Sequence, residues 1–316
     1  MTGRMTVKTY NSTVTSCLLC HSSNTAEVTS LRASDICRLY RRHFDIDPSS
    51  LLSAGTIYLR KCLACGLICF DPPDTGNSEF YDRIQRNNSY YMESKHEYHV
   101  ALAQIREGDN VLEVGAGSGN FAKLLKNNQY TGLELSSKAV KAANDGRIIL
   151  QSIQNHAISH PEAYDVVCLF QVLEHITDPR QFLEDCIRCI KTGGKLIIAL
   201  PSSDSIMGTL INFPLDMPPH HVTRWPDSVL RNMGKLLPLQ LLLLQHEPLP
   251  PRQIRFIRRS GAIARIYKLF NRPMPLIDFS LFKKCSTSIA VLASLVGLPA
   301  VSTDSGVHVT AVYRKG

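Results

Sequence analysis

The 316-residue sequence has no long apolar run that would indicate an export signal or a membrane span. Residues 1–16 are polar, so we expect a cytoplasmic rather than a secreted protein. Residues 285–296 are uncharged, but this stretch is too short and too polar to predict a transmembrane helix. In a reducing compartment, the ten cysteines are better explained as thiols or metal ligands than as disulfides.

Internal repeats and low-complexity tracts are also missing, and the 44% apolar and 20% charged composition is typical of a globular protein. Acidic residues are scarce in one segment. Between Val229 and Lys284, eleven Lys or Arg residues face only two acids, Glu247 and Asp278. The formal net charge of +8 therefore comes from this C-terminal segment, and the rest of the chain is close to neutral.

Two common nucleotide-binding patterns are absent. There is no Gly-Lys-Ser/Thr, and the glycines at 115, 117 and 119 are spaced Gly-x-Gly-x-Gly instead of Gly-x-Gly-x-x-Gly. The sequence instead has a short apolar strand that runs into these glycines, and Glu134 ends the next strand. Glycines allow a tight turn and close approach of a ligand, and a carboxylate there can accept bonds from ribose hydroxyls. An ordinary turn with a surface acid is the alternative.

From residue 110 onward, strands alternate with helices, which predicts a parallel sheet. The predicted strands are 110–114, 130–135, 147–151, 165–170, 195–199, 239–246 and 307–314, of which the last two pair antiparallel. The predicted helices are 120–127, 137–144, a turn near 155, 179–190 and 226–235. The preceding segment, 17–73, is predicted to be irregular apart from a helix at 30–44. We expect two domains, 1–75 and 76–316, the second with a basic helical insertion at about 250–300.

Three motifs together resemble the class I S-adenosylmethionine-dependent methyltransferases. They are the glycine turn 113–119 with Glu134, the block YDVVCLFQVLEHITDP at 164–179, and KTGGKL at 191–196. The resemblance is strong over residues 97–201 and looser over the last two strands. It implies an α/β fold with a Rossmann-like seven-stranded sheet, helices on both faces, and S-adenosylmethionine as the cofactor.

The resemblance also assigns cofactor contacts to individual residues. Gly115, Gly117 and Gly119 would face the methionine part. Glu113 would help to hold its amino group, and Glu134 would bind the ribose.

Further contacts would come from the ends of the next two strands. Ser152 and Ile153 would lie beside the adenine, and Phe170 and Gln171 would border the methionine end. His175 would open a helix, where packing or positioning is a more usual role for a histidine than carrying a proton.

Two Cys-x-x-Cys pairs, Cys17/Cys20 and Cys62/Cys65, indicate a structural Zn²⁺ site, because four thiolates at this spacing suit closed tetrahedral coordination. Metal binding would supply the folding energy that so small a domain lacks. Other candidate ligands are His21, Cys37 and Cys69. Scattered buried cysteines or a redox pair are the alternatives.

The cysteine pairs, with Phe80-Tyr81 and Tyr90-Tyr91 downstream, resemble the zinc-ribbon methyltransferases of bacterial sugar and natural-product pathways. Tyr90 and Tyr91 would fold over the cofactor or pack between domains.

Methyl transfer to a hydroxyl requires alignment of donor and acceptor and removal of a proton. The loop 218–225, PPHHVTRW, places His220 and His221 near the expected strand ends, and we hypothesise that one of them is the general base. Surface or structural histidines are the alternative. The absence of an Asn-Pro-Pro-Tyr-like sequence after the fourth strand argues against methylation of an exocyclic amine.

The leading hypothesis is O-methylation of a sugar, nucleotide sugar or other small metabolite in polysaccharide or natural-product biosynthesis. The alternatives are C-methylation of a keto-sugar nucleotide, a zinc-ribbon RNA methyltransferase and a silent cofactor-binding scaffold. The basic residues lack interleaved aromatic platforms and lie far from the cysteines in sequence, which argues against a nucleic-acid partner. The basic segment 229–284 could cap the catalytic domain, contact an anionic membrane peripherally, or attract a phosphorylated acceptor.

Overall fold

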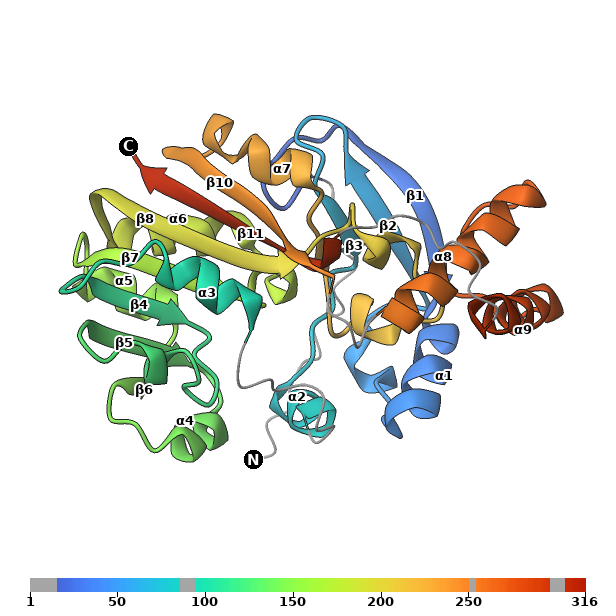
Figure 1. The fold of residues 1–316 in the computed structure, drawn as a ribbon, viewed down its shortest axis with the longest axis horizontal. Coiled ribbons are helices and arrows are strands. Elements are labelled where there is room, and N and C mark those ends of the chain that lie inside the picture. Colours follow the sequence, from blue (N-terminus) through green and yellow to red (C-terminus); the bar gives the residue numbers. More distant parts are fainter. Residues whose placement is uncertain (1–15, 86–94, 250–253, 296–304) are drawn as a thin grey trace, which may run out of the picture.

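The computed structural model describes residues 16–85, 95–249, 254–295 and 305–316 (Figure 1). Its larger sheet has seven strands in the order β10-β11-β8-β7-β4-β5-β6. The strands are β4 (Asn110–Val114), β5 (Gln129–Glu134), β6 (Ile148–Leu150), β7 (Tyr164–Phe170), β8 (Ile190–Pro201), β10 (Leu239–Pro248) and β11 (Ser305–Lys315). The strands from β8 to β6 run parallel, while β11 pairs antiparallel with both β8 and β10. This arrangement confirms the predicted Rossmann-like sheet, including its antiparallel last pair.

Each face of this sheet has its own hydrophobic core, because successive residues of a strand point to opposite faces. On one face, Val111 packs with Tyr98 and Ala101 of α3 (His96–Leu102). On the other face, Leu112 belongs to the core that includes Phe182 and Leu183 of α6 (Pro179–Cys189). Helices therefore cover both faces, as predicted.

The smaller sheet has the order β1-β2-β3-β9 and is antiparallel throughout. Its strands are β1 (Thr25–Arg32), β2 (Thr56–Cys62), β3 (Ile68–Asp71) and β9 (Thr223–Arg224). The prediction of an irregular segment at 17–73 was therefore wrong. Ile57 and Leu59 of β2 alternate with less buried neighbours, but this alternation spans too few residues to predict a strand from the sequence alone.

Two helix predictions also need correction. The helix expected at 30–44 is α1 (Ala33–Phe44), because residues up to Arg32 belong to β1. The helix expected at 120–127 is reduced to the 3₁₀ turn η2 (Ala122–Leu124). The chain leaves the turn at Leu125, and shortly afterwards the Asn128 amide donates to the backbone carbonyls of Arg106 and Asp109, at 2.6 and 3.2 Å.

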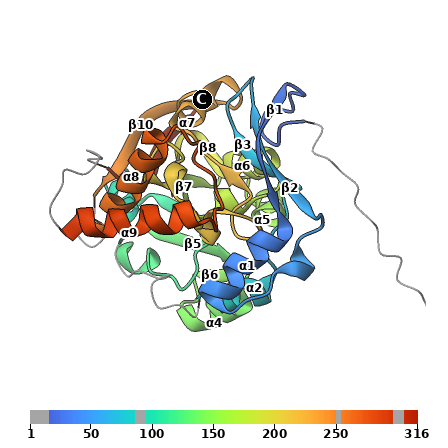
Figure 2. The same cartoon turned by 90° about the vertical axis from the view of Figure 1, so that its right-hand side faces the viewer.

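The remaining helices are α2 (Ser78–Gln85), α4 (Ser137–Ala143), α5 (Ile153–Ser159), α7 (Asp227–Arg231), α8 (Ile254–Leu269) and α9 (Leu281–Leu295). Of these helices, α4 and α5 connect strands of the larger sheet, and α8 and α9 extend from one end of the molecule (Figures 1 and 2). The 3₁₀ turns are η1 (Ser49–Leu51), η3 (Leu173–His175), η4 (Ile206–Thr209), η5 (Pro214–Asp216) and η6 (Met233–Lys235). Among the described helices, none combines the length and the hydropathy that crossing a bilayer requires.

Candidate active site

A cavity of about 1840 Å³ lies at the carboxyl ends of the parallel strands, where ligands of open α/β sheets bind. Both candidate base histidines and eight of the nine residues predicted to contact the cofactor line it. They are Glu113, Gly115, Gly117, Glu134, Ser152, Ile153, Phe170, Gln171, His220 and His221. Gly119 is not among the lining residues. The fold thus brings together most of the predicted site, although the role of each residue stays a prediction.

The turn after β4 needs its glycines for conformational reasons. Gly115, Gly117 and Gly119 have φ angles of 81°, 53° and 75°, a region that other residues rarely adopt. A Cβ on Gly115 would lie 2.5 Å from Cγ2 of Val172, and one on Gly119 would lie 2.7 Å from Cδ1 of Ile148. Gly119 therefore allows close packing against β6 instead of facing the cavity.

Two carboxylates flank this turn in different environments. The Glu134 carboxylate accepts hydrogen bonds from the backbone N–H groups of Gly117, Leu135 and Ser136, each at 2.8 Å. These bonds hold it at the end of β5, beside the glycine turn. Glu113 is buried and accepts a hydrogen bond from the Tyr130 hydroxyl. Burial raises the pKa of Glu113 to about 8, so it retains a proton near neutrality.

The next two strands deliver the rest of the predicted cofactor contacts. Ser152 caps α5 by accepting a hydrogen bond from the Asn155 N–H at 3.3 Å, and Ile153 is buried behind it. The Phe170 ring lies 4.9 Å from that of Phe121. Gln171 has a φ of 58°, which is strained for a residue other than glycine and is often associated with functional sites.

Three histidine rings that line the cavity contact one another. His175 lies in η3, and its ring centroid is 4.7 Å from that of His220 and 4.9 Å from that of His221. The rings of His220 and His221 are stacked at 4.5 Å. Burial lowers the pKa of His175 to about 4 and those of His220 and His221 well below the usual value. All three imidazoles are therefore neutral at pH 7.

The partners of these rings determine which nitrogen carries the proton. Nδ1 of His175 lies 2.6 Å from the backbone oxygen of His220, and Nδ1 of His220 lies 2.8 Å from that of Leu215. A carbonyl oxygen can only accept, so both Nδ1 atoms are protonated and each Nε2 has the basic lone pair. Nδ1 of His221 lies 3.4 Å from Oδ1 of Asp216, whose other oxygen is 2.6 Å from Nη2 of Arg224.

Glu174 is a site residue that sequence reasoning missed. It is 2% exposed, lines the cavity, and neither of its carboxylate oxygens has a hydrogen-bond partner in the described structure. Oε1 lies 3.9 Å from Nε2 of His175 and 4.0 Å from Nε2 of His221. Burial raises the pKa of Glu174 to about 8. The sequence signal is the position of Glu174 directly before His175, which by itself predicts only the start of a helix.

Two groups of residues on this wall of the cavity have the spacing of a metal site. One ring nitrogen each from His175, His220 and His221 lie within 4.8 Å of one another, and so do ligand atoms of Glu97, Glu247 and His308. In the second group, Nδ1 of His308 already pairs with Glu247 at 3.2 Å. Hydrogen bonding and ion pairing thus account for that group without a metal.

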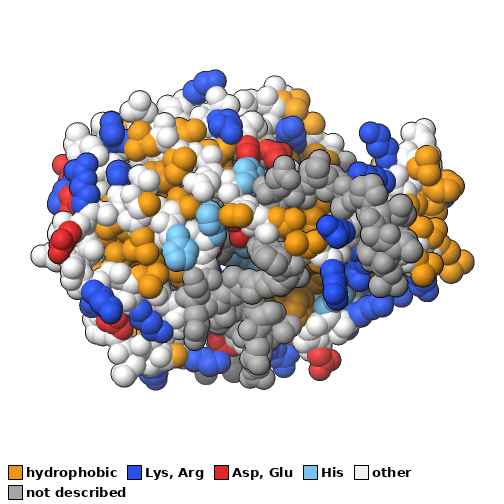
Figure 3. Space-filling view, in the orientation of Figure 1, with side chains coloured by type: hydrophobic (Ala, Val, Ile, Leu, Met, Phe, Trp, Pro, Cys, Tyr) orange, Lys and Arg blue, Asp and Glu red, His pale blue; other side chains and the backbone are white. Residues whose placement is uncertain are grey.

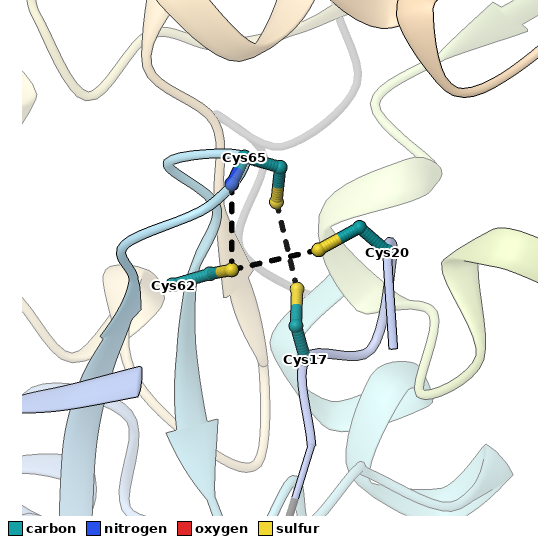
Figure 4. Close-up of side chains that lie close together, drawn as sticks. All are labelled: Cys17, Cys20, Cys62 and Cys65. Carbon is teal, nitrogen blue, oxygen red and sulfur yellow. Dashed lines mark hydrogen bonds between the residues drawn. The ribbon is translucent and has the colours of Figure 1, made fainter. Parts of the chain in front are cut away.

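The four predicted zinc ligands converge from the turn at Cys17 and Cys20 and from the end of β2 with the turn that follows it (Figure 4). Their sulfur atoms all lie within 4.8 Å of one another, with 3.5 Å between Cys17 and Cys65 and between Cys20 and Cys62. Tetrahedral zinc with Zn–S bonds of 2.3 Å requires sulfurs about 3.8 Å apart, so the set fits this metal. None of the four lines the cavity, and the alternative ligands Cys37, Cys69 and His21 are not in the cluster.

A family model described as a methyltransferase domain matches residues 84–244, just over half of the chain. The chain belongs to this methyltransferase family. The match confirms the methyltransferase resemblance that the glycine turn and the block at 164–179 carried. Tyr90 and Tyr91, which we expected to fold over the cofactor or pack between domains, lie outside the described residues.

Relatives of this methyltransferase include two bacterial proteins named ubiquinone biosynthesis O-methyltransferase. The one from Sodalis glossinidius is 33% identical over 102 residues, which cover 29% of this chain and 41% of the relative. The one from Thiobacillus denitrificans is 36% identical over 97 residues, 28% of this chain and 42% of the relative. The methyltransferase therefore spans about two fifths of the length of these relatives. A solved SAM-dependent methyltransferase from Archaeoglobus fulgidus is 15% identical, with a TM-score of 0.46 over 69% of this chain and 90% of that one.

Proposed function

We propose that the enzyme transfers a methyl group from S-adenosylmethionine to a hydroxyl oxygen of a sugar, nucleotide sugar or other small metabolite, in polysaccharide or natural-product biosynthesis. One observation carries the proposal: buried, neutral histidines share a cavity with the residues assigned to the cofactor. The word O-methyltransferase in the names of the two bacterial relatives agrees with a hydroxyl acceptor.

The residues present fit the proposed cofactor. Gly115 and Gly117 have no side chains that would block a ligand. Glu134 lies beside this turn, and its carboxylate oxygens can accept hydrogen bonds from ribose hydroxyls. S-adenosylmethionine supplies a methyl group that is already activated on a sulfonium. The protein's task is then to align the acceptor, exclude water and take up its proton.

Proton removal falls to His221 in this proposal, with His220 as the other candidate. Asp216 contacts Nδ1 of His221 and is itself held by Arg224, so it orients the ring and stabilises the imidazolium that forms. Nε2 of His221 faces the cavity wall formed by Glu174 and accepts the acceptor's proton as the methyl group is transferred. A lowered pKa keeps this nitrogen unprotonated at neutral pH.

The experiment is labelled-methyl transfer to candidate sugars and nucleotide sugars, with the product bond identified by NMR. We expect an O-methyl product, and we expect His221→Ala to lower kcat by about 10²-fold or more while S-adenosylhomocysteine binding persists. Near-normal turnover by His220→Ala and His221→Ala, each with cofactor bound, would contradict the assigned base. A C-methyl product or methylated RNA would instead support one of the competing functions.

We further propose that the cysteine cluster binds one structural Zn²⁺. The sulfur spacing supports this metal, and a closed set of four thiolates leaves no position for substrate.

The division into domains 1–75 and 76–316 is likewise a proposal. The two would be joined through β9, which pairs Arg224 with Ile68 of β3.

A further inference from the structure

The helical hairpin formed by α8, α9 and the segment between them combines cations with exposed apolar side chains. Residues 254–292 contain eight Lys or Arg residues and one acid, Asp278. They also carry seven of the fifteen large apolar side chains that are exposed in the described structure: Phe256, Leu269, Phe270, Leu281, Ile289, Val291 and Leu292. The hairpin extends from one end of the molecule (Figures 1 and 2), where blue and orange side chains lie together in Figure 3.

Three of these side chains, Leu269, Phe270 and Leu281, lie where α8 ends and α9 begins, and we call them the apolar tip. These side chains are 81%, 62% and 75% exposed. Ring contacts fix the position of Phe270 in the tip, because the centroid of the Phe282 ring lies 5.4 Å from that of Phe270 and 5.0 Å from that of Tyr267. Exposed apolar groups held in a fixed arrangement usually mark an interaction site.

Positively charged side chains lie beside the apolar tip, and the one acidic residue of the hairpin does not neutralise their charge. Lys268 and Arg272 are exposed next to the tip, and Cζ of Arg272 lies 4.4 Å from the Phe282 ring centroid. Asp278 is engaged within the hairpin, where it accepts hydrogen bonds from the Tyr267 hydroxyl at 2.5 Å and the Ser280 N–H at 2.7 Å. The surface is therefore both apolar and strongly cationic, and an anionic bilayer is its complement.

The hairpin is also tied to the wall of the active-site cavity. Ile257 of α8 packs in a core with Met207, which lines the cavity. Asn212 and Asp278 exchange two hydrogen bonds, at 2.7 and 2.8 Å, and Phe213 beside Asn212 also lines the cavity. If the hairpin binds to a surface outside the protein, the cavity therefore lies close to that surface.

We propose that the hairpin docks peripherally on an anionic lipid bilayer. The apolar tip enters the boundary between headgroups and acyl chains, and the surrounding Lys and Arg side chains contact anionic headgroups. Apolar insertion and charge attraction together give the two signals that stable peripheral binding needs. Docking would present the cavity to an acceptor carried by the membrane, a consequence that rests on the proposed function, whereas docking itself does not.

The test is co-sedimentation of the full chain with phosphatidylcholine vesicles, with and without phosphatidylglycerol. We expect binding only when phosphatidylglycerol is present, and weakening as salt is raised. The triple variant Leu269→Asp/Phe270→Asp/Leu281→Asp should lower the partition coefficient by about tenfold or more. Lys268→Gln and Arg272→Gln should each lower it by about fivefold.

Ile158→Asp is the matched control, because Ile158 is 73% exposed on α5, at the opposite end of the molecule in Figure 1. It should bind vesicles like the unmodified chain, and every variant should retain S-adenosylhomocysteine binding as a measure of folding. The proposal would be overturned if the chain bound pure phosphatidylcholine vesicles equally well, or if the triple variant and Ile158→Asp bound vesicles equally. It would also be overturned if the chain formed a dimer without vesicles that the triple variant lost, or if it bound RNA in preference to vesicles. If the unmodified chain transferred no methyl group to any candidate acceptor in vesicle-free solution, that result would instead count against the proposed function.

Discussion

At the scale of single residues, the cavity wall holds a carboxylic acid in an environment that disfavours its charge. Glu174 is buried, and its oxygens have no hydrogen-bond partner in the described structure. The charged groups around it act in opposite directions: His308 and Lys95 favour ionisation, and Glu97 opposes it. Burial dominates, and the raised pKa follows.

This environment makes stability depend on pH in a definite direction. The unfolded chain loses the Glu174 proton near its ordinary pKa of 4.5, but the folded chain keeps it up to about 8. Folding is therefore increasingly penalised as the pH rises through this interval. We expect Glu174→Gln to be more stable than the unmodified chain at pH 8 by about 2 kcal/mol, with the difference vanishing near pH 4. Urea unfolding of both proteins at the two pH values measures this, and a difference that does not change with pH would contradict it.

The glycine turn supports a second prediction at this scale. Gly115→Ala would put a methyl group 2.5 Å from Cγ2 of Val172 at a φ of 81°. We expect a loss of about 1–3 kcal/mol in the free energy of unfolding and at least about tenfold weaker binding of S-adenosylhomocysteine.

Gly146→Ala is the control, since a Cβ there meets nothing within 4 Å. Calorimetric titration and thermal unfolding of both variants provide the comparison. Unchanged cofactor binding by Gly115→Ala would remove the turn from the cofactor site.

At the scale of elements, the cysteine loops are packed onto the catalytic part of the chain. Cys17, Cys62 and Leu67 share a core with Trp225, which precedes α7, and with Val229, which lies in α7. Trp225 is fully buried and is the one tryptophan of the sequence. Its fluorescence therefore reports on the contact between the two parts.

Removal of the proposed zinc should be visible through this tryptophan. We expect about one zinc per chain, and we expect chelation or Cys17→Ser to lower Tm and shift the Trp225 emission to the red, because the loops that cover the ring lose their metal. Cys37→Ser should keep its zinc, since Cys37 is buried but outside the cluster. Elemental analysis, emission spectra and melting curves check these outcomes. A metal-free chain with unchanged stability would contradict a structural zinc.

At the scale of the whole molecule, the parts that could be predicted from sequence are those built from neighbours in the chain. The strands from β4 to β8 follow from apolar runs between turns, and the glycine turn and the cysteine pairs are short motifs. A parallel sheet then brings the carboxyl ends of its strands together, which is why Glu134 and Gln171 line one cavity as expected.

Other features required segments that are distant in sequence to meet. β9 is two residues long and is recognisable only because β3 pairs with it. The meeting of His175 with His220 and His221, and the isolation of Glu174 behind them, depend on the loop 217–222 folding over η3.

The sequence by itself thus determined the fold class, the cofactor turn and the four clustered cysteines, because short-range periodicity and spacing encode them. The tertiary structure alone decided which side chains lose their water. That loss of solvent neutralises the three histidines and raises the pKa of Glu174, whereas the apolar tip of the α8–α9 hairpin remains exposed. Burial is a sum over contacts from the whole chain, and no local pattern of residues specifies it.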